Sequence, residues 1–244
     1  MSFPKNFKPS KKFDLIRLGN NNDGGYLVGK NTISRSNFLV SLGVGDDCSF
    51  EKDFLKYNKK VNIYCYDRYP LGKNYFIKEI IKSLIILDFK NVYHFFKVMM
   101  DYKYTFKNDK VKKRLIRYKS LTKIINENQL DCDVFLKIDI EGAEYRILTD
   151  ILENQNIFTG IIIEFHDVDF HKQKIKLFID SLNLSLTHIH ENNSSIIDTE
   201  NDPTCIELTF EKTPLVVDEN PVLPHLLDQK NFPHLKNKKI NFEK

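Results

Sequence analysis

Carboxylates and a histidine end two apolar segments of the chain, and side chains of these types can move protons. In DVFLKIDIEGAEY the apolar run contains Asp139 and stops at Glu141, and in GIIIEFHD the run stops at Glu164 and His166. Buried charge costs free energy, so ionisable groups at the end of a buried strand usually serve a function. The unperturbed pKa of histidine is close to neutral, which makes His166 the first candidate general base. We expect Asp139 and Glu141 to act in the same reaction.

Two other roles for these side chains stay open. Asp139 with Glu164 or His166 could hold a hard divalent cation such as Mg²⁺ or Mn²⁺, which prefers oxygen ligands. The acids could also form ordinary salt bridges with Lys137 and Arg146. Function is the better interpretation, because two segments carry the same unusual pattern.

The segment THIHENN is a third place where chemistry can be expected. Alternation along a strand puts His188 and His190 on one face, and Asn192 and Asn193 follow just beyond. A single histidine is more often structural, but this cluster favours a catalytic or substrate-binding element. His190 is therefore the second candidate base. We expect His190, Asn192 and Asn193 to contact the substrate together with Glu164.

Two glycines in SLGVGDD could bring the backbone close to a cofactor. Gly43 and Gly45 follow an apolar run, and glycine can turn sharply with no Cβ in the way. Asp67 ends the run IYCYD about twenty residues later, where an acid can bind ribose hydroxyls. A tight turn and a capping aspartate are the structural alternatives. The third glycine of the dinucleotide fingerprint is missing, which disfavours NAD.

The segment NNNDGGY offers another glycine turn. Asp23, Gly24 and Gly25 have the composition of a hairpin turn, and Tyr26 starts the next apolar run. Two glycines also expose backbone N–H groups to a ligand carboxylate. The turn is therefore either a plain hairpin or a loop that binds a cofactor.

Alternating strand and helix patterns predict the elements that position these residues. Strands are expected at 38–42, 62–66, 92–98, 133–140, 160–165, 184–190 and 205–210, and helices at 50–57, 74–87, 120–128, 143–153 and 171–182. This order predicts an α/β fold with a doubly wound, mostly parallel sheet. The last two strands lack a helix between them and should pair antiparallel. A hairpin is expected at 15–28.

Composition indicates one globular domain. A chain of 244 residues with 41% hydrophobic residues can bury one substantial core. We expect a single domain over 1–213 and an extension over 214–244 that packs on the surface or on the neighbour in a homodimer. No apolar run reaches the length of a membrane span, the N-terminus lacks an export signal, and the cysteines are widely spaced, which predicts a cytoplasmic protein.

Positive charge concentrates in residues 103–123, although the formal net charge is only +4. A solvated surface or a mobile insertion is the favoured interpretation. The alternative is a patch that faces the phosphates of a nucleotide sugar or a nucleic acid. The segment matches no known nucleic-acid-binding module, so no specific nucleic acid is expected.

These motifs together resemble the FkbM-type S-adenosylmethionine-dependent methyltransferases. KIDIEGAEY carries the resemblance most specifically, with Gly43, Gly45 and Asp67 upstream and EFHD downstream. RLGNNNDGGYLV, HIHENN and CIELTF look like a bacterial branch that modifies the sugars of surface polysaccharides. The resemblance runs from about residue 16 to residue 210.

The resemblance implies a Rossmann-like seven-stranded sheet with a reversed last strand, and methyl transfer to a hydroxyl group. Gly43 and Gly45 would pass under the methionine part of S-adenosylmethionine, and Asp67 would hold its ribose. Asp139 and Glu141 would lie where the methyl donor and acceptor meet. Ser41 stands where the common methyltransferase turn has an acid. The methionine amine would therefore bind Asp46, Asp47 or the loop formed by Asp23, Gly24, Gly25 and Tyr26.

The predicted activity is O-methylation of a sugar hydroxyl, on a nucleotide-activated sugar or a capsule or lipooligosaccharide sugar. Two rival functions remain at this stage. One is an NAD-dependent sugar-nucleotide enzyme on the same fold, and the other is a non-catalytic protein that binds nucleotides or nucleic acid through residues 103–123.

Overall fold

A seven-stranded mixed sheet organises the chain. The computed structural model describes residues 2–68, 73–115 and 120–243. In spatial order the strands are β6 (Val111–Leu115), β5 (Asn62–Asp67), β4 (Phe38–Leu42), β7 (Val134–Ile138), β8 (Phe158–Phe165), β10 (Ile206–Glu211) and β9 (Ser185–Glu191). β10 runs antiparallel to both of its neighbours, and the five strands from β6 to β8 are parallel. The predicted α/β fold with a reversed last strand is confirmed.

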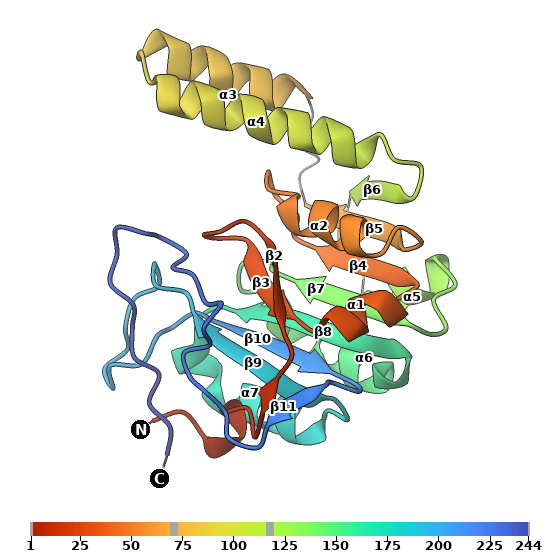
Figure 1. The fold of residues 1–244 in the computed structure, drawn as a ribbon, viewed down its shortest axis with the longest axis vertical. Coiled ribbons are helices and arrows are strands. Elements are labelled where there is room, and N and C mark those ends of the chain that lie inside the picture. Colours follow the sequence, from red (N-terminus) through yellow and green to blue (C-terminus); the bar gives the residue numbers. More distant parts are fainter. Residues whose placement is uncertain (1, 69–72, 116–119, 244) are drawn as a thin grey trace.

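Helices cover both faces of this sheet, which explains why its central strands are apolar throughout. Every residue of β7 and β8 is buried. Alternate residues feed two clusters of buried side chains, so that Leu136 packs on one face and Phe135 on the other. α5 (Leu121–Glu127), α6 (Leu148–Glu153) and α7 (Val168–Ser181) cover the first face, and α1 (Lys30–Arg35) and α2 (Ser49–Tyr57) cover the second (Figure 1). Strands buried on both faces read as continuous apolar runs.

The expected hairpin is present and lies on the second face. β2 (Ile16–Gly19) pairs antiparallel with β3 (Gly25–Val28). Its buried residues Leu18, Tyr26 and Val28 join the cluster formed by α1, α2 and the sheet. This packing brings the NNNDGG turn to the same side of the molecule as the glycine turn after β4.

The strand predicted at 92–98 is wrong, because these residues belong to a helix. α4 (Phe89–Phe106) pairs with α3 (Lys73–Ile85) in a helical hairpin that projects from the domain (Figure 1). Asp88 caps α4 by accepting a hydrogen bond from the backbone N–H of Asn91. Aromatic and β-branched residues favour strands locally, but the apolar residues here recur at helical spacing.

The seventh strand is β6, inside the basic segment that was expected to be a solvated surface or a mobile insertion. β6 forms the edge of the sheet beside β5. Its cations lie over aromatic rings, with Lys112 over Tyr64 and Lys113 over Tyr102. Consecutive lysines are common on edge strands, because they discourage pairing with another chain. Residues 116–119 of this basic segment lie outside the described residues.

The remaining short elements lie around the domain. They are η1 (Lys5–Phe7), β1 (Lys12–Phe13), η2 (Glu144–Arg146), η3 (Gln155–Ile157) and β11 (Val216–Asp218). The helix predicted at 143–153 is therefore split into η2 and α6. Within the described ranges, no helix combines the length and the hydrophobicity that a bilayer crossing demands.

The segment after β10 packs on its own chain. β11 pairs with β1, and the backbone of Phe3 bonds to that of Asn241 and Glu243. Closer to the sheet, Nδ2 of Asn231 donates to the carboxylates of Asp23 and Glu207. The extension thus reaches the turn between β2 and β3.

Two buried histidines of β9 anchor this segment. His188 Nε2 lies 2.8 Å from Asp228 Oδ1, and His190 Nε2 lies 3.1 Å from Asn231 Oδ1. Burial opposes a charge on His190, but Asp228 and Glu207 outweigh it and raise its pKa to about 9. The same histidines hold the pKa of Asp228 below its usual range, against the effect of burial.

We expect the melting temperature to fall as the pH rises through about 9. The folded state holds the His190 proton more tightly than the unfolded state, so this stabilisation is complete below about pH 6.5 and is lost through the folded pKa. At roughly 2–4 °C per kcal/mol, the loss should amount to several degrees. His190→Gln should give a flatter pH dependence in differential scanning calorimetry. Equal slopes for both proteins would contradict this account.

Candidate active site

A cavity of about 1350 Å³ opens at the carboxyl ends of β4, β5 and β7. Its walls are the turn at 43–47, Asp67 and Arg68 after β5, the segment at 139–147, and the hairpin tip at 23–24. Parallel strands deliver their loops to the same edge, which is where open α/β sheets bind ligands. Leu121 and Ile124 of α5 also line the cavity. Five segments that are distant in the sequence therefore contribute to one cavity.

Gly43 directly follows β4, where its backbone lies close to that of Asp139 after β7. Its φ of +79° suits glycine, and a Cβ atom here would lie 1.5 Å from the carbonyl oxygen of Asp139. Gly45 also has a positive φ, of +56°, but a Cβ there would meet nothing within 4 Å. The Gly45 N–H donates to Asp67 Oδ2 at 2.7 Å. The two glycines thus differ: Gly43 permits the backbone contact, and Gly45 leaves room in the cavity.

A buried lysine supports the floor of the cavity. Lys137 Nζ donates to the Gly43 carbonyl oxygen at 3.3 Å and lies over the ring of Tyr26. Burial disfavours its charge, but Glu51, Asp139 and Glu164 outweigh burial and raise its pKa. Burial in turn raises the pKa of Glu51, although Lys137 opposes this shift. Lys137 therefore acts as a shared positive charge rather than as the partner of one carboxylate.

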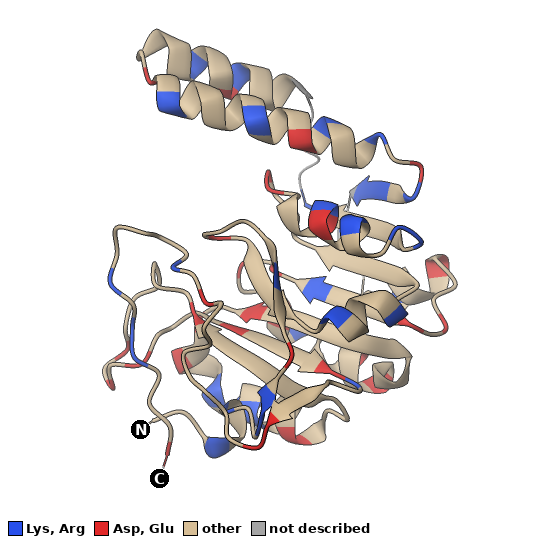
Figure 2. Ribbon diagram, viewed as in Figure 1, with Lys and Arg blue, Asp and Glu red and all other residues tan. Residues whose placement is uncertain are grey.

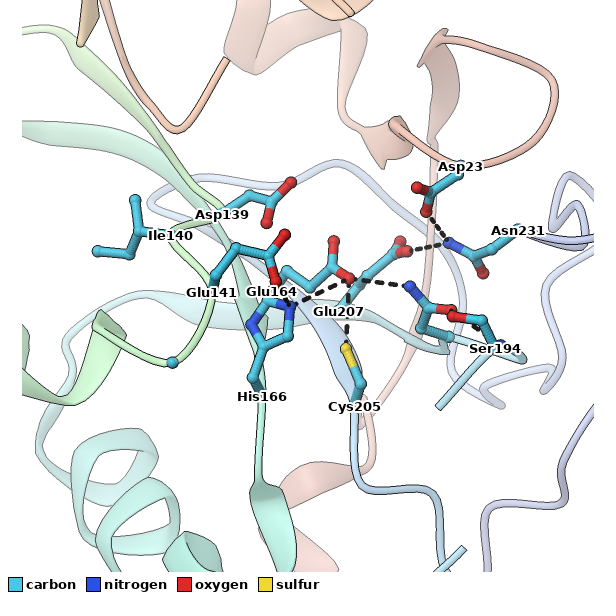
Figure 3. A network of polar contacts seen from close by, with 12 residues as sticks. Asp23, Asp139, Ile140, Glu141, Glu164, His166, Ser194, Cys205, Glu207 and Asn231 are labelled. Atoms are coloured by element: carbon cyan, nitrogen blue, oxygen red, sulfur yellow. Dashed lines mark hydrogen bonds and ion pairs between the residues drawn. The ribbon is translucent and has the colours of Figure 1, made fainter. Parts of the chain in front are cut away.

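Glu164 is a buried carboxylate on β8, and three side chains bond to it. Tyr26 Oη donates to Oε2 at 3.1 Å, and Asn192 Nδ2 donates to Oε1 at 2.9 Å. Cys205 Sγ donates to the same Oε1 at 3.3 Å (Figure 3). Tyr26 Oη also lies 3.3 Å from Asp139 Oδ2. Burial and the nearby Asp139 raise the pKa of Glu164, against the opposing effect of Asn192. The carboxylates that end β7 and β8 are thus linked through one hydroxyl group.

His166 is held between carboxylates beside the cavity. Its Nδ1 lies 2.9 Å from Glu144 Oε1. Its Nε2 lies 3.5 Å from Glu141 Oε2 and 3.9 Å from Glu164 Oε1 (Figure 3). Burial opposes its protonation, but the hydrogen bond and charge of Glu144 raise its pKa to about 9. Glu144 thereby orients the ring, and Nε2 faces the acids that end the two strands.

Glu144 also stabilises a strained turn. Glu141 has a φ of +53°, which is unfavourable for a residue with a side chain and costs on the order of 1 kcal/mol. Glu144 Oε1 accepts hydrogen bonds from the backbone N–H groups of Ile140 and Gly142 on either side of it. The Glu141 side chain is 86% exposed as a result. Strain kept beside a cavity in this way is typical of functional sites.

The other predicted site residues fall into two groups. Asp23, Gly24 and Asp47 line the cavity, and Asp47 also accepts from Asn20 and from the first turn of α2. Gly25 is the first residue of β3 and is not among the residues that line the cavity. His190 and Asn193, in contrast, do not line the cavity, because both anchor the C-terminal segment. Asn193 exchanges hydrogen bonds with the backbone of Phe232.

Three important residues were missed or misread in the sequence. Glu51 and Glu144 received no role, although Glu144 lies three residues after Glu141 in the EGAE turn. The available signal was that Glu144 is a second carboxylate close to Gly142, a residue that predicts a turn. Lys137 was considered only as a salt-bridge partner. Glu51 lies on α2, 86 positions before Lys137, so no local pattern indicated that the two charges would interact.

Among the residues that the structure describes, three sets of side chains could share a metal ion; Asp198, Glu200 and Asp202 form one of them away from the cavity, and the other two include His166. The ligand atoms of Asp139, Glu141 and His166 lie within 4.8 Å of one another, as do those of Glu164, His166 and Cys205. The first set is the better match to Mg²⁺ or Mn²⁺, because two of its three ligands are oxygens. The predicted set of Asp139, Glu164 and His166 is divided between these two groups.

Comparison with known families shows which family this chain belongs to. A model of the methyltransferase FkbM domain matches residues 31–193, which is 163 of the 244 residues. The chain belongs to this family. The FkbM resemblance is thereby confirmed, and the chain is an S-adenosylmethionine-dependent methyltransferase. The match includes both glycines of the turn, Asp67 and the carboxylates that end β7 and β8.

Solved methyltransferase structures are similar to this FkbM methyltransferase at low identity. Precorrin-6y C5,15-methyltransferase from Geobacter metallireducens GS-15 is 11% identical, with a TM-score of 0.41 over 75% of this chain and 85% of that chain. The METTL16 methyltransferase domain is 13% identical, with a TM-score of 0.44 over 74% and 61%. TYW2 from M. jannaschii, in complex with AdoMet, is 15% identical, with a TM-score of 0.37 over 75% and 74%. Comparison with curated proteins gave no match.

We expect Gly43→Ala in this FkbM methyltransferase to weaken binding of S-adenosylhomocysteine at least tenfold. The new methyl group would collide with the backbone of Asp139, so β4 and β7 must separate at the floor of the cavity. Isothermal titration calorimetry would measure the affinity. Gly45→Ala has similar backbone strain without the collision with Asp139, so a loss of affinity there would come from strain or from contact with the cofactor. Equal affinities for wild type and Gly43→Ala would contradict the assignment of this floor.

Proposed function

We propose that this methyltransferase transfers the methyl group of S-adenosylmethionine to a hydroxyl group of a sugar. The observation that carries the proposal is the Glu144–His166 pair, in which Glu144 fixes Nδ1 and Nε2 faces the carboxylates beside the cavity. A hydroxyl is a poor nucleophile until it loses its proton, so such a base is useful for O-methylation. The family match favours this activity over the NAD-dependent enzyme and the non-catalytic binding protein.

The polar side chains around His166 support a sugar as the acceptor. Asp139, Glu141 and Glu164 supply carboxylate oxygens, which accept hydrogen bonds from several hydroxyl groups at once. Arg146 also lines the cavity, and its guanidinium can bind a phosphate through two parallel hydrogen bonds. These groups together suit a nucleotide-activated sugar, which carries both hydroxyls and phosphates.

The cofactor-binding half has residues that fit S-adenosylmethionine. Asp67, at the end of β5, would accept hydrogen bonds from the ribose, and Gly45 leaves space beside it for the methionine part. Asp23 and Asp47 line the same cavity and would bind the methionine amine. The cofactor, when bound, supplies an electrophilic methyl group. Alignment of that group with the acceptor can lower the barrier by roughly 7–11 kcal/mol.

His166 would take the proton from the acceptor hydroxyl through Nε2. Glu144 would stabilise the resulting imidazolium, since it is fully buried and bonded to Nδ1. The same charge raises the pKa of His166 to about 9, so the neutral base becomes more abundant as the pH rises. Asp139 and Glu141 would hold the acceptor in place.

We expect His166→Gln to lower kcat by about 10²–10⁴ with little change in affinity for S-adenosylhomocysteine. In the wild type, kcat/KM should rise with pH to a plateau above about 9. Glu144→Gln removes the charge that raises the pKa, so the midpoint should move to lower pH. Methyl transfer to a panel of nucleotide-activated sugars would provide the readout. His234→Gln, an exposed histidine of the tail, is the matched control. Full activity of His166→Gln would exclude this base.

A divalent cation is the second candidate for activating the hydroxyl, favoured by the convergence of Asp139, Glu141 and His166. A cation there would lower the pKa of a bound hydroxyl directly. The proposed histidine base needs no ion, so we expect activity to survive exhaustive chelation. Activity that is lost with chelator and restored by Mg²⁺ or Mn²⁺ would favour the cation instead. Activity measured with and without added Ca²⁺ would control for non-specific ion effects.

A further inference from the structure

Among the residues that the structure describes, the side-chain contacts that join the helical hairpin of α3 and α4 to α2 lie near the base of the hairpin. Asp101 forms an ion pair with Lys52 of α2 at 2.5 Å, and Thr105 accepts a hydrogen bond from Cys48. Between the helices, Phe76 of α3 packs on Tyr102 of α4, with ring centroids 5.2 Å apart. The outer parts of both helices extend into solvent (Figure 1).

Each helix of this hairpin exposes a stripe of large apolar side chains. On α3 the stripe consists of Ile77, Ile81 and Leu84, and on α4 it consists of Phe89, Tyr93, Phe96 and Met100. These side chains are between 37% and 70% exposed. The residues recur at intervals of four and three, as in the seams along which two helices pack. Isolated apolar side chains on a surface are normal, but two continuous stripes are not.

Both stripes lie on the same face of the hairpin. On α3 the stripe begins one residue after the inward-facing Phe76, and on α4 Phe96 follows the inward-facing Phe95 in the same way. One residue further along a helix, the side chain is turned by about 100° around the helix axis. In two antiparallel helices, this turn from the inward-facing residue points to the same side of the pair in both. Thr105, which contacts α2, follows Phe96 by nine residues and therefore points to the opposite side. The apolar face is directed away from the domain.

The apolar face is rimmed by lysines and lacks acids. Three lysines each directly follow a residue of the stripes, namely Lys78, Lys90 and Lys97. They therefore lie along the outer edges of the apolar face. All three acids of the hairpin are engaged elsewhere: Glu79 pairs with Lys82, Asp88 caps α4, and Asp101 pairs with Lys52. Figure 2 shows the resulting excess of basic over acidic bands along the hairpin.

We propose that this face binds the same face of a second copy of the chain, so that two hairpins form a four-helix bundle. With roughly 200 Å² for each fully exposed large side chain, the stripes expose on the order of 700 Å². That is close to the roughly 800 Å² per partner that a stable interface buries. Seams between helices and helices that lie on membranes share this spacing, so the area of the face is what favours a second copy. A two-fold axis would build this interface from the same face of both copies.

The lysine rim makes the proposal testable through the effect of salt. In a symmetric dimer, the rims of the two copies face each other, so like charges oppose association. Salt screens this repulsion and should strengthen the dimer. The rival occupant is an anionic membrane surface, which would attract the same lysines. Salt should weaken that interaction.

Sedimentation velocity on the full-length protein provides the main test. We expect a dimer at micromolar concentration, with a dissociation constant that falls several-fold when the salt concentration is raised. Tyr93→Glu combined with Phe96→Glu should weaken association at least 100-fold, because both side chains are exposed in the single chain and central in the proposed seam. Ile81→Glu tests the α3 stripe separately. His94→Glu is the matched control, since it is exposed on the other side of α4 and should leave the dimer intact.

Circular dichroism and binding of S-adenosylhomocysteine would establish that each variant is folded. A wild-type protein that remains monomeric at about 100 µM would overturn the proposal. A dimer that persists in both stripe variants would also overturn it, because the interface would lie elsewhere. So would a monomer that cosediments with phosphatidylglycerol vesicles at low salt and is released at high salt. Methyltransferase activity is not needed for any of these readouts, so failure here is separate from failure of the proposed reaction.

Discussion

The buried ammonium group of Lys137 is the interaction on which the site depends. It lies under the Gly43 turn and within the field of carboxylates from α2, β7 and β8. Removing such a charge from water is costly, and only several nearby acids can compensate for that cost. The same positive charge offsets part of the repulsion between acids that end neighbouring strands, although Asp139 still raises the pKa of Glu164. The cofactor side and the acceptor side of the cavity therefore share one electrostatic support.

A second network connects the acceptor side to segments that are distant in the sequence. Tyr26, from the hairpin, bonds to Glu164 of β8 and lies close to Asp139 after β7. Asn231, from the C-terminal segment, bonds to Asp23 at the tip of the same hairpin and to Glu207 of β10 (Figure 3). The hairpin is thus fixed from both ends. This explains how a loop outside the main sheet can be positioned as a wall of the cavity.

Errors in the sequence interpretation had physical causes. Residues 92–98 contain aromatic and β-branched residues that suit a strand, yet the capping of α4 by Asp88 and its pairing with α3 decide for a helix. β6 was not predicted as a strand, because its three consecutive cations are typical of a solvated segment. An edge strand nevertheless tolerates such residues. The contacts of His190 and Asn193 with Asn231 and Phe232 could not be predicted, because these partners lie about forty residues later in a segment with no regular pattern.

Short segments of the sequence suffice to predict the parallel sheet, the reversed last strand, the two glycine turns and the acids at the strand ends. Each of these follows from local periodicity or from a turn that needs glycine. The meeting of ionisable groups depends on the folded chain, which brings together Glu144 and His166, Glu51 and Lys137, and His190 and the C-terminal segment. Electrostatic and hydrogen-bonding partners are chosen by distance in space, which the order of residues along the chain does not specify.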